Sequence, residues 1–206
     1  DIDSLSLNMT DINSLSRELE NIRTFDFNNL KNRGFSLEKA LIKLYCYLCN
    51  DTNNILADKT KSNELLAQLA QTNNPYCKEC LLKVLKNSPV DVNSKNKDGE
   101  TPLLLALKSY QTARTSKEKL SCMQNIKCLL DYGADVDIDD MNGQTPLHHA
   151  VFTNNIILFN ELLGKHPNVN HTDILGKNPL QYLSPDPEDP MRKVYYLYAQ
   201  KRALNQ

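Results

Sequence analysis

The chain has 206 residues, with 24 lysines and arginines against 25 aspartates and glutamates, a formal net charge of −1. A chain of this length can bury a sizeable core. Its balanced charge provides no overall electrostatic attraction to nucleic acid or to an acidic membrane surface. No apolar run approaches the roughly 20 residues of a membrane span. Composition therefore disfavours a nucleic-acid-binding protein and a membrane-spanning one.

Residues 1–61 form an N-terminal segment with two predicted helices, at 14–23 and 36–48. In the second, apolar side chains follow the i, i+3, i+4 spacing of one helix face. Residues 50–62 are rich in Asn, Asp, Thr and Lys, which is typical of a loop. We expect residues 1–61 to cap the rest of the chain or to form a small helical lobe.

Two Cys-x-x-Cys pairs follow, Cys46 with Cys49 and Cys77 with Cys80. Two such pairs are a pattern of zinc sites. However, Cys46 and Cys49 lie one turn apart in helical-looking sequence, and a free cysteine in a core behaves as a small hydrophobic residue. We expect the cysteines to be structural, with no metal and no cofactor bound. A zinc-stabilised adaptor is the alternative.

Two sequence strings recur in the second half of the chain with the same offsets of 44 and then 33 residues. The first stands at 98–106 (DGETPLLLA), 142–150 (NGQTPLHHA) and, more weakly, 175–180 (LGKNPL). The second stands at 90–93 (VDVN), 134–137 (ADVD) and 168–170 (NVN). Gly suits a turn with positive φ, while Thr and Pro suit the start of a helix. Each unit is therefore predicted to be a turn, a short helix and a longer helix.

These units resemble the ankyrin repeat, a β-turn finger and two antiparallel helices in about 33 residues with a Thr-Pro-Leu-His signature. Residues 142–170 match best and include His148. Residues 98–137 match except for Leu104 in the His position and an excess of about 11 residues between the helices. The resemblance implies an all-α helical solenoid over residues 62–206. We expect its repeats at about 62–95, 96–139, 140–172 and 173–206.

The first and last units lack a full signature, so we place them by the repeat offset. Helices are expected at 63–69 and 80–85 in the first unit and at 191–200 in the last. In this alignment Cys80 takes the place of Ile157, which we expect to face the core. Stacked repeats need ends that cover their apolar faces, so both degenerate units should act as caps.

The extra residues of the second unit, Ser109–Asn125, carry Arg114, Lys117 and Lys119 with one acidic residue, Glu118. We expect a solvated extension whose deletion leaves the fold intact, because loop length adds little closure entropy. The alternative is a binding feature, since insertions in such arrays map to one face.

Two further motifs suggest metal binding or catalysis, but each lacks residues that such a site needs. Residues 135–140 begin like a calcium-binding EF-hand loop, but Asp140 stands where Gly is needed and Pro146 where a bidentate Glu is needed. We expect a solvated acidic finger there, which would favour a basic partner segment. The resemblance implies that His148 hydrogen-bonds a neighbouring turn. No nucleophile-elbow, zinc-hydrolase or phosphate-loop motif accompanies it, so we expect no enzymatic activity.

The resemblance implies that fingers and first helices line a concave face that binds a partner protein. The candidate contact residues in those positions are Lys97, Asp98, Glu100, Lys108, Ser109, Met141, Asn142, Gln144, Phe152, Thr153, Ile174, Leu175 and Lys177. Met141, Phe152, Ile174 and Leu175 stand out, because exposed apolar side chains that lie together mark interaction sites. In the alternative, the last two pack against the terminal helix around Tyr195 and Tyr198.

We therefore predict a non-enzymatic protein-protein interaction module, monomeric alone and cytoplasmic, whose rigid face binds a partner segment with little ordering cost. The alternative is a targeting arm for an enzyme or effector whose active region is residues 1–61 or lies outside this sequence. The 24 asparagines and 18 lysines indicate an AT-biased genome. That bias suits a pathogen protein acting in a host's cytoplasm as well as an ordinary adaptor.

Overall fold

The computed structural model describes residues 59–73 and 77–204, and the expectations for residues 1–58 lie outside this part of the chain. The described elements are α4 (Lys59–Gln71), α5 (Cys77–Asn87), α6 (Pro102–Thr112), α7 (Ser116–Asp131), α8 (Pro146–Phe152), α9 (Ile156–Leu163), the 3-10 helix η3 (Pro179–Tyr182) and α10 (Pro190–Leu204). Within these ranges there is no strand, and no helix is long and apolar enough to cross a membrane.

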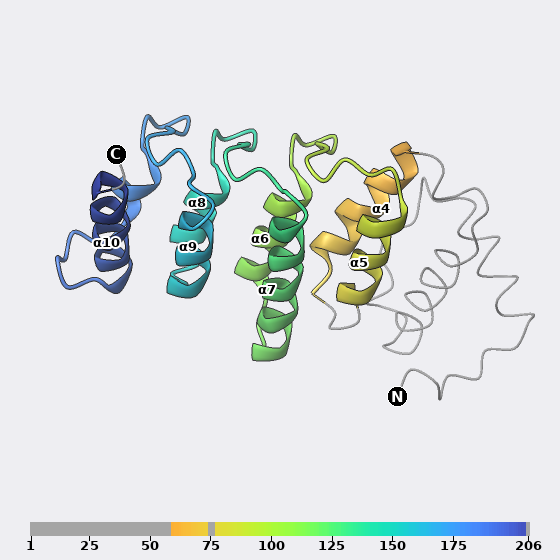
Figure 1. Cartoon of the computed structure of the whole chain (residues 1–206), viewed down its shortest axis with the longest axis horizontal. Coiled ribbons are helices and arrows are strands. Elements are labelled where there is room, and N and C mark those ends of the chain that lie inside the picture. The colour runs from red at the N-terminus through yellow and green to blue at the C-terminus, as the bar shows by residue number, and fades with distance from the viewer. Residues whose placement is uncertain (1–58, 74–76, 205–206) are drawn as a thin grey trace, which may run out of the picture.

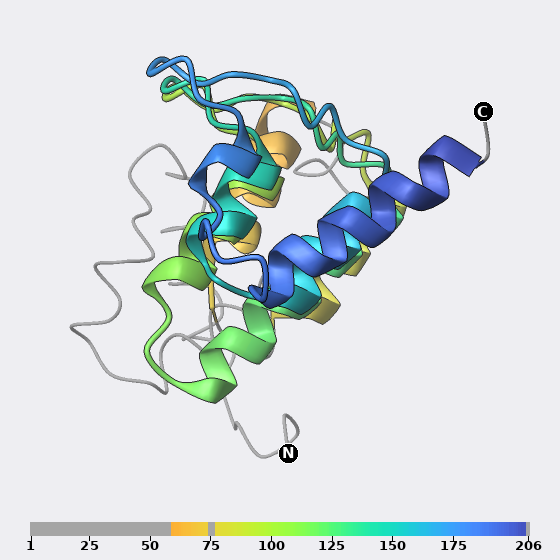
Figure 2. The ribbon, with the colours of Figure 1, turned by 90° about the vertical axis from the view of Figure 1, so that its left-hand side faces the viewer.

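Consecutive helices pair and stack along the long axis as α4–α5, α6–α7 and α8–α9, and the stack continues with η3, which packs on α8, and α10, which packs on α9. Finger-like loops project from one edge of the stack (Figure 1). Viewed along that axis, the fingers extend over the side formed by the first helices, and the second helices lie on the opposite side (Figure 2). This all-helical solenoid is the predicted fold class.

The core runs through the stack between the two layers of helices. Leu66, Leu103 and Leu147 belong to successive first helices, and Leu81 and Leu129 to second helices; all are at most 1% exposed. Burying one such side chain contributes about 1.5–3 kcal/mol. Because each helix shares this core with the next pair, no unit could bury its apolar face alone.

The Thr-Pro prediction is confirmed at both clear helix starts. Thr101 precedes Pro102, and its hydroxyl accepts a hydrogen bond from the Leu104 N–H at 3.3 Å. Thr145 also precedes Pro146 at the start of α8, but its hydroxyl contacts His148 Nδ1, at 2.9 Å, instead of a backbone N–H. The Thr-Pro pairs therefore mark where these first helices begin.

Two predictions are wrong. The extra residues around Ser109–Asn125 do not form a solvated extension: they lengthen α6 and α7, leaving residues 113–115 as the link. Ile157 does not face the core but is largely exposed, whereas Cys80 is buried. The buried face of α9 is formed by Leu158, Phe159, Leu162 and Leu163, and Ile157, the second residue of the helix, lies outside that face.

Candidate functional site

The three fingers share one hydrogen-bonding scheme. In each, the first and last residues pair through their backbones, as in Asp140 N–H to the Gln144 carbonyl at 3.0 Å, with equivalent bonds of 2.9 Å and 3.0 Å in the other fingers. The side chain of the first residue also accepts two N–H groups of its turn; for Asp140 these are Asn142 at 2.9 Å and Gln144 at 3.1 Å. The fingers are thus fixed by their own backbones.

Adjacent fingers also touch each other directly. The Ile174 N–H donates to the Asn142 carbonyl at 3.0 Å. Gly143, with φ +71, lies so close to the next finger that a Cβ there would come within 3.1 Å of the Asp173 Cα. On the other side, a Cβ on Gly99 would lie 3.4 Å from the Met141 Cγ. Successive finger tips therefore form one rigid ridge.

Three apolar side chains stand exposed on this ridge: Met141, Ile174 and Leu175, which we call the finger-tip triad. Their exposed fractions are 76%, 71% and 69%. The alternative in which Ile174 and Leu175 pack against the terminal helix is therefore wrong. The backbone groups at the finger tips are hydrogen-bonded within and between fingers. The triad therefore exposes apolar side chains on a rigid backbone.

Phe152 lies apart from the triad, on the floor formed by the first helices. Its ring makes edge contacts with His149, at 6.0 Å between centroids, and with Tyr182, at 5.0 Å. Phe152 is 41% exposed. Lys177 places its ammonium over the Tyr182 ring, 5.3 Å from the centroid. Tyr182 was missed from sequence, although it stands 33 residues after His149 in the same repeat position.

Charged residues of two repeats meet beneath the fingers. The Lys108 ammonium lies 2.6 Å from Glu100 Oε1 and 2.9 Å from Asp140 Oδ2. His149 Nε2 lies 3.1 Å from the same Asp140 oxygen. The prediction that residues 135–140 form a solvated acidic finger is thus wrong for Asp140, which is buried and paired. Sequence spacing within one finger could not show a partner contributed by another helix.

Burial and ion pairing shift the pKa values of these groups in opposite directions. Burial opposes the charge of Asp140, but the bonds from Lys108 and the turn N–H groups outweigh it, so the pKa of Asp140 lies below its ordinary value. For Lys108, burial is likewise outweighed by Glu100 and Asp140, and its pKa is raised. Burial lowers the pKa of His149 despite Asp140. Lys108 and Glu100 are therefore partly exposed residues whose charges are already paired within the protein.

The remaining candidate residues occupy different settings. Lys97 and Asp98 are exposed at the first finger tip, and Lys177 is exposed at the end of the third finger. Ser109 is buried and donates to the Gln71 carbonyl, so its prediction as a contact residue is wrong. Thr153 uses its hydroxyl to close α8 on the Ala150 carbonyl, at 2.7 Å.

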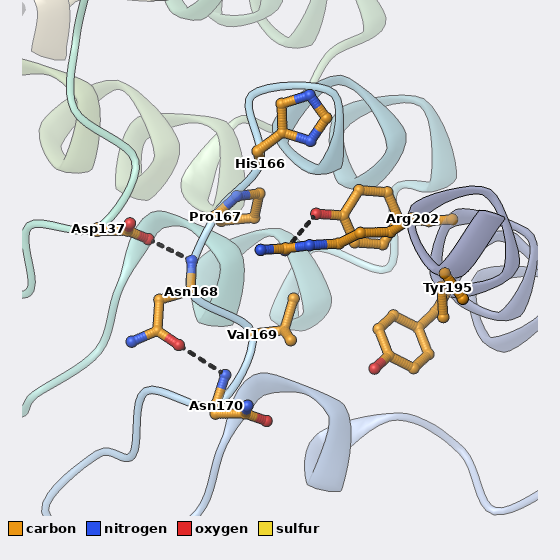
Figure 3. Close-up of a pocket in the computed structure, with 11 residues that line it drawn as sticks. Asp137, His166, Pro167, Asn168, Val169, Asn170, Tyr195 and Arg202 are labelled. Carbon is orange, nitrogen blue, oxygen red and sulfur yellow. Dashed lines mark hydrogen bonds between the residues drawn. The ribbon is translucent and has the colours of Figure 1, made fainter. Parts of the chain in front are cut away.

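A separate hollow of about 560 Å³ lies at the C-terminal end, between the 166–170 loop and α10 (Figure 3). Arg202 faces it and donates to the Tyr198 hydroxyl at 3.1 Å. The loop N–H of Asn168 is already bonded to Asp137, at 2.7 Å, and that of Asn170 to Asn168. The N–H groups of Asn168 and Asn170 are thus engaged within the protein.

The cysteines give no metal site among the residues that the structure describes. Cys46 and Cys49 lie outside those residues. Cys80 is buried, as predicted, but it is disulfide-bonded and so does not offer a zinc-binding thiolate. Cys122 and Cys128 are buried free thiols, and burial raises the pKa of Cys122 to about 11, which leaves it protonated at neutral pH.

Comparison with known proteins agrees with this architecture. A family model described as ankyrin repeats in three copies matches residues 66–173. The mouse B-cell lymphoma 3 protein homolog is 31% identical over 111 residues, covering 53% of this chain and 22% of that protein. The variola virus ankyrin repeat protein OPG189 is 31% identical over 99 residues, covering 48% and 16%. Mouse Rabankyrin-5 is 36% identical over 73 residues, covering 35% and 5%.

The chain thus spans less than a quarter of the length of these relatives. Ankyrin repeats are protein-protein interaction modules, and the family match covers the stacked helix pairs and the fingers described above. With its repeated caps, its fingers and this match over half its length, the chain belongs to the ankyrin-repeat family.

Proposed function

We propose that the fingers and first helices of this chain bind a segment of another protein, with the finger-tip triad at the centre of the contact. The observation that carries the proposal is the exposure of Met141, Ile174 and Leu175 on fingers whose backbones are internally bonded. Burying exposed apolar surface drives association, and a rigid surface avoids the entropy cost of ordering it.

The polar candidates surround the triad and would form the rim. They are Lys97, Asp98, Glu100, Lys108, Asn142, Gln144, Thr153 and Lys177, with Phe152 on the groove floor. Rim charges steer association more than they add affinity. Lys97 and Lys177 flank the apolar tips, so carboxylates beside an apolar core would suit the partner segment.

The test begins with a photoreactive amino acid in place of Met141 or, as a control, of the exposed Leu197 on α10. Both versions of the full chain are irradiated in a eukaryotic lysate. A protein cross-linked from position 141 only is then purified for affinity measurements. Cross-links of equal pattern from both positions would contradict the proposed surface.

Affinity is then compared for Met141→Asp/Ile174→Asp and for the matched control Tyr196→Asp/Leu197→Asp. Central interface residues each contribute about 2 kcal/mol or more, so the first pair should weaken binding by a factor of about 100 or more. Melting curves should match the parent chain for both pairs, because all four side chains are exposed. Unchanged affinity in the folded finger variant would refute the proposal.

The finer assignments rest on this binding role. We propose that the chain acts without catalysis, as a monomer, in the cytoplasm. Because the chain spans less than a quarter of its relatives, the alternative is a recruiting arm within a larger enzyme or effector. The similarity to a variola virus protein accords with an effector in a host cell, and the identity of the cross-linked partner would test that assignment.

A further inference from the structure

The link between α6 and α7 projects beyond the ends of the neighbouring helix pairs (Figures 1 and 2). It does so because α6 has 11 residues and α7 has 16, whereas α8 and α9 have 7 and 8. We call residues 110–120 the hairpin tip. It lies at the end of the helices remote from the fingers (Figure 1). The tip is therefore a surface separate from the proposed groove.

The hairpin tip has a fixed conformation rather than that of a slack loop. Thr115 caps α7, its hydroxyl accepting the Glu118 N–H at 3.1 Å, while the Glu118 carboxylate accepts the N–H groups of Thr115 at 3.2 Å and Arg114 at 2.8 Å. Ala113 is buried, and so is Tyr110, whose hydroxyl accepts from Asn155 of the next repeat. A rigid projection of this kind can present side chains to a partner.

Three exposed cations gather on the hairpin tip: Arg114, Lys117 and Lys119. No carboxylate of the described residues lies within ion-pair distance of any of them. The single acidic residue of the tip, Glu118, directs its carboxylate to backbone N–H groups. Lys119 lies over the Tyr110 ring, 5.8 Å from its centroid. The tip therefore presents a local positive charge on a chain whose net charge is −1.

The positions of Lys117 and Lys119 oppose the stability of their own helix. Both lie in the first turn of α7, which begins at Ser116. The N-terminal end of a helix carries partial positive charge, so cations there are unfavourable and carboxylates favourable. The helix dipole therefore does not account for these two lysines.

Leu120 adds an apolar contact to this charged surface. Its side chain is 59% exposed and follows Lys119 directly. A protein segment can supply both carboxylates for the cations and an apolar side chain for Leu120, whereas an anionic bilayer would meet only this one apolar side chain on a narrow projection. We propose that the hairpin tip is a second docking surface, which binds an acidic segment of a partner protein with an apolar side chain against Leu120.

The experiment uses the full chain and a fluorescein-labelled peptide in which glutamates flank a pair of leucines. Its binding is measured by fluorescence anisotropy. Arg114→Glu/Lys117→Glu/Lys119→Glu is compared with Lys86→Glu/Lys201→Glu/Arg202→Glu, which changes the net charge equally at exposed positions elsewhere. The hairpin variant should lose affinity by about tenfold or more and the control by less than about twofold.

Two further measurements separate a functional role from a structural one. The hairpin variant should melt no lower than the parent chain, because its new glutamates at positions 117 and 119 suit the first turn of α7. Raising the salt from about 0.1 M to about 1 M shortens the Debye length from about 10 Å to about 3 Å and should weaken peptide binding. Leu120→Ser should weaken it at either salt concentration.

Three outcomes would overturn the proposal. Equal loss of affinity in both charge-reversed variants would show a general charge effect. Equal binding of a glutamine version of the peptide would show that carboxylates are not recognised. Binding of polyuridylate or phosphatidylserine vesicles through the same cations, with no binding of the acidic peptide, would assign the tip to another class of partner.

Discussion

The imidazole Nε2–H of His148 donates a hydrogen bond to the backbone carbonyl of Lys177, 3.1 Å away in the next finger. Nδ1 of the same ring accepts the Thr145 N–H at 3.1 Å, which fixes the neutral tautomer. The signature histidine thus joins the start of α8 to the following finger, as the family resemblance implied. Burial lowers the pKa of His148, as it does that of His149.

Acidification should therefore destabilise the fold. In the unfolded chain both histidines protonate near pH 6.5, but in the folded chain they protonate only at lower pH. The unfolded state then binds more protons, so stability is complete above about pH 6.5 and falls as pH drops below it. Each histidine contributes a slope of at most about 1.4 kcal/mol per pH unit. Urea unfolding from about pH 7.5 to about pH 5 measures this.

His149→Leu provides the control, because it removes one of the two titrating groups. Asp140, with its lowered pKa, adds stability that is lost only below its ordinary range, so it does not contribute between pH 5 and 7.5. The His149→Leu chain should show a shallower slope over this interval. A parent chain whose stability rises on acidification would contradict the assignment of both histidines as buried and neutral.

Local chemistry explains how much of this fold could be predicted. The starts of α6 and α8 follow from Thr-Pro pairs, because capping depends only on neighbouring residues. The exposure of Met141 and Ile174 follows in the same way from their places at turn tips. The pairing of Lys108 with Asp140 could not be foreseen, since it depends on how closely two repeats stack.

The extra residues of the second unit carry a local helix-start signal. Thr115 and Glu118 have the spacing of a capping box, which predicts the start of a helix within the supposed extension. The deletion of residues 112–119 would remove this cap and the first turn of α7, so it can no longer be expected to leave the fold intact.

Leu147→Ala should destabilise the array by about 2–5 kcal/mol, the usual range for truncating a buried leucine. Leu147 is 1% exposed on α8, in the core between neighbouring helix pairs. Leu197→Ala, at an exposed position on α10, should change the free energy of unfolding by less than about 0.5 kcal/mol. Urea unfolding of both variants provides the comparison, and equal stabilities would mean that Leu147 does not occupy the core.

His166→Gly should stabilise the chain, by about 0.5–1 kcal/mol. His166 has φ 58, a left-handed conformation that costs an ordinary side chain energy, and it stands 33 residues after Gly133, which has φ 85. The reverse test is Gly133→Ala, where no atom lies within 4 Å of a new Cβ, so any loss reports backbone strain alone. Thermal melts should move in opposite directions for the two variants. A lower melting temperature for His166→Gly would show that the imidazole contact with Tyr198 outweighs the strain.

Gly143→Ala and Gly176→Ala separate backbone strain from contact between fingers. The two glycines have nearly the same φ, +71 and +72, so a new methyl group costs about 1–2 kcal/mol of strain at either. A Cβ on Gly143 would also approach backbone atoms of Asp173 and Ile174 at 3.1–3.3 Å, whereas one on Gly176 meets nothing within 4 Å. Gly143→Ala should therefore lose more stability and should weaken the Ile174 N–H bond to Asn142, which amide hydrogen exchange at Ile174 would detect. Equal exchange in both variants would mean that the tips of the second and third fingers move independently, and the finger-tip triad would then lack the rigid support on which its proposed binding role depends.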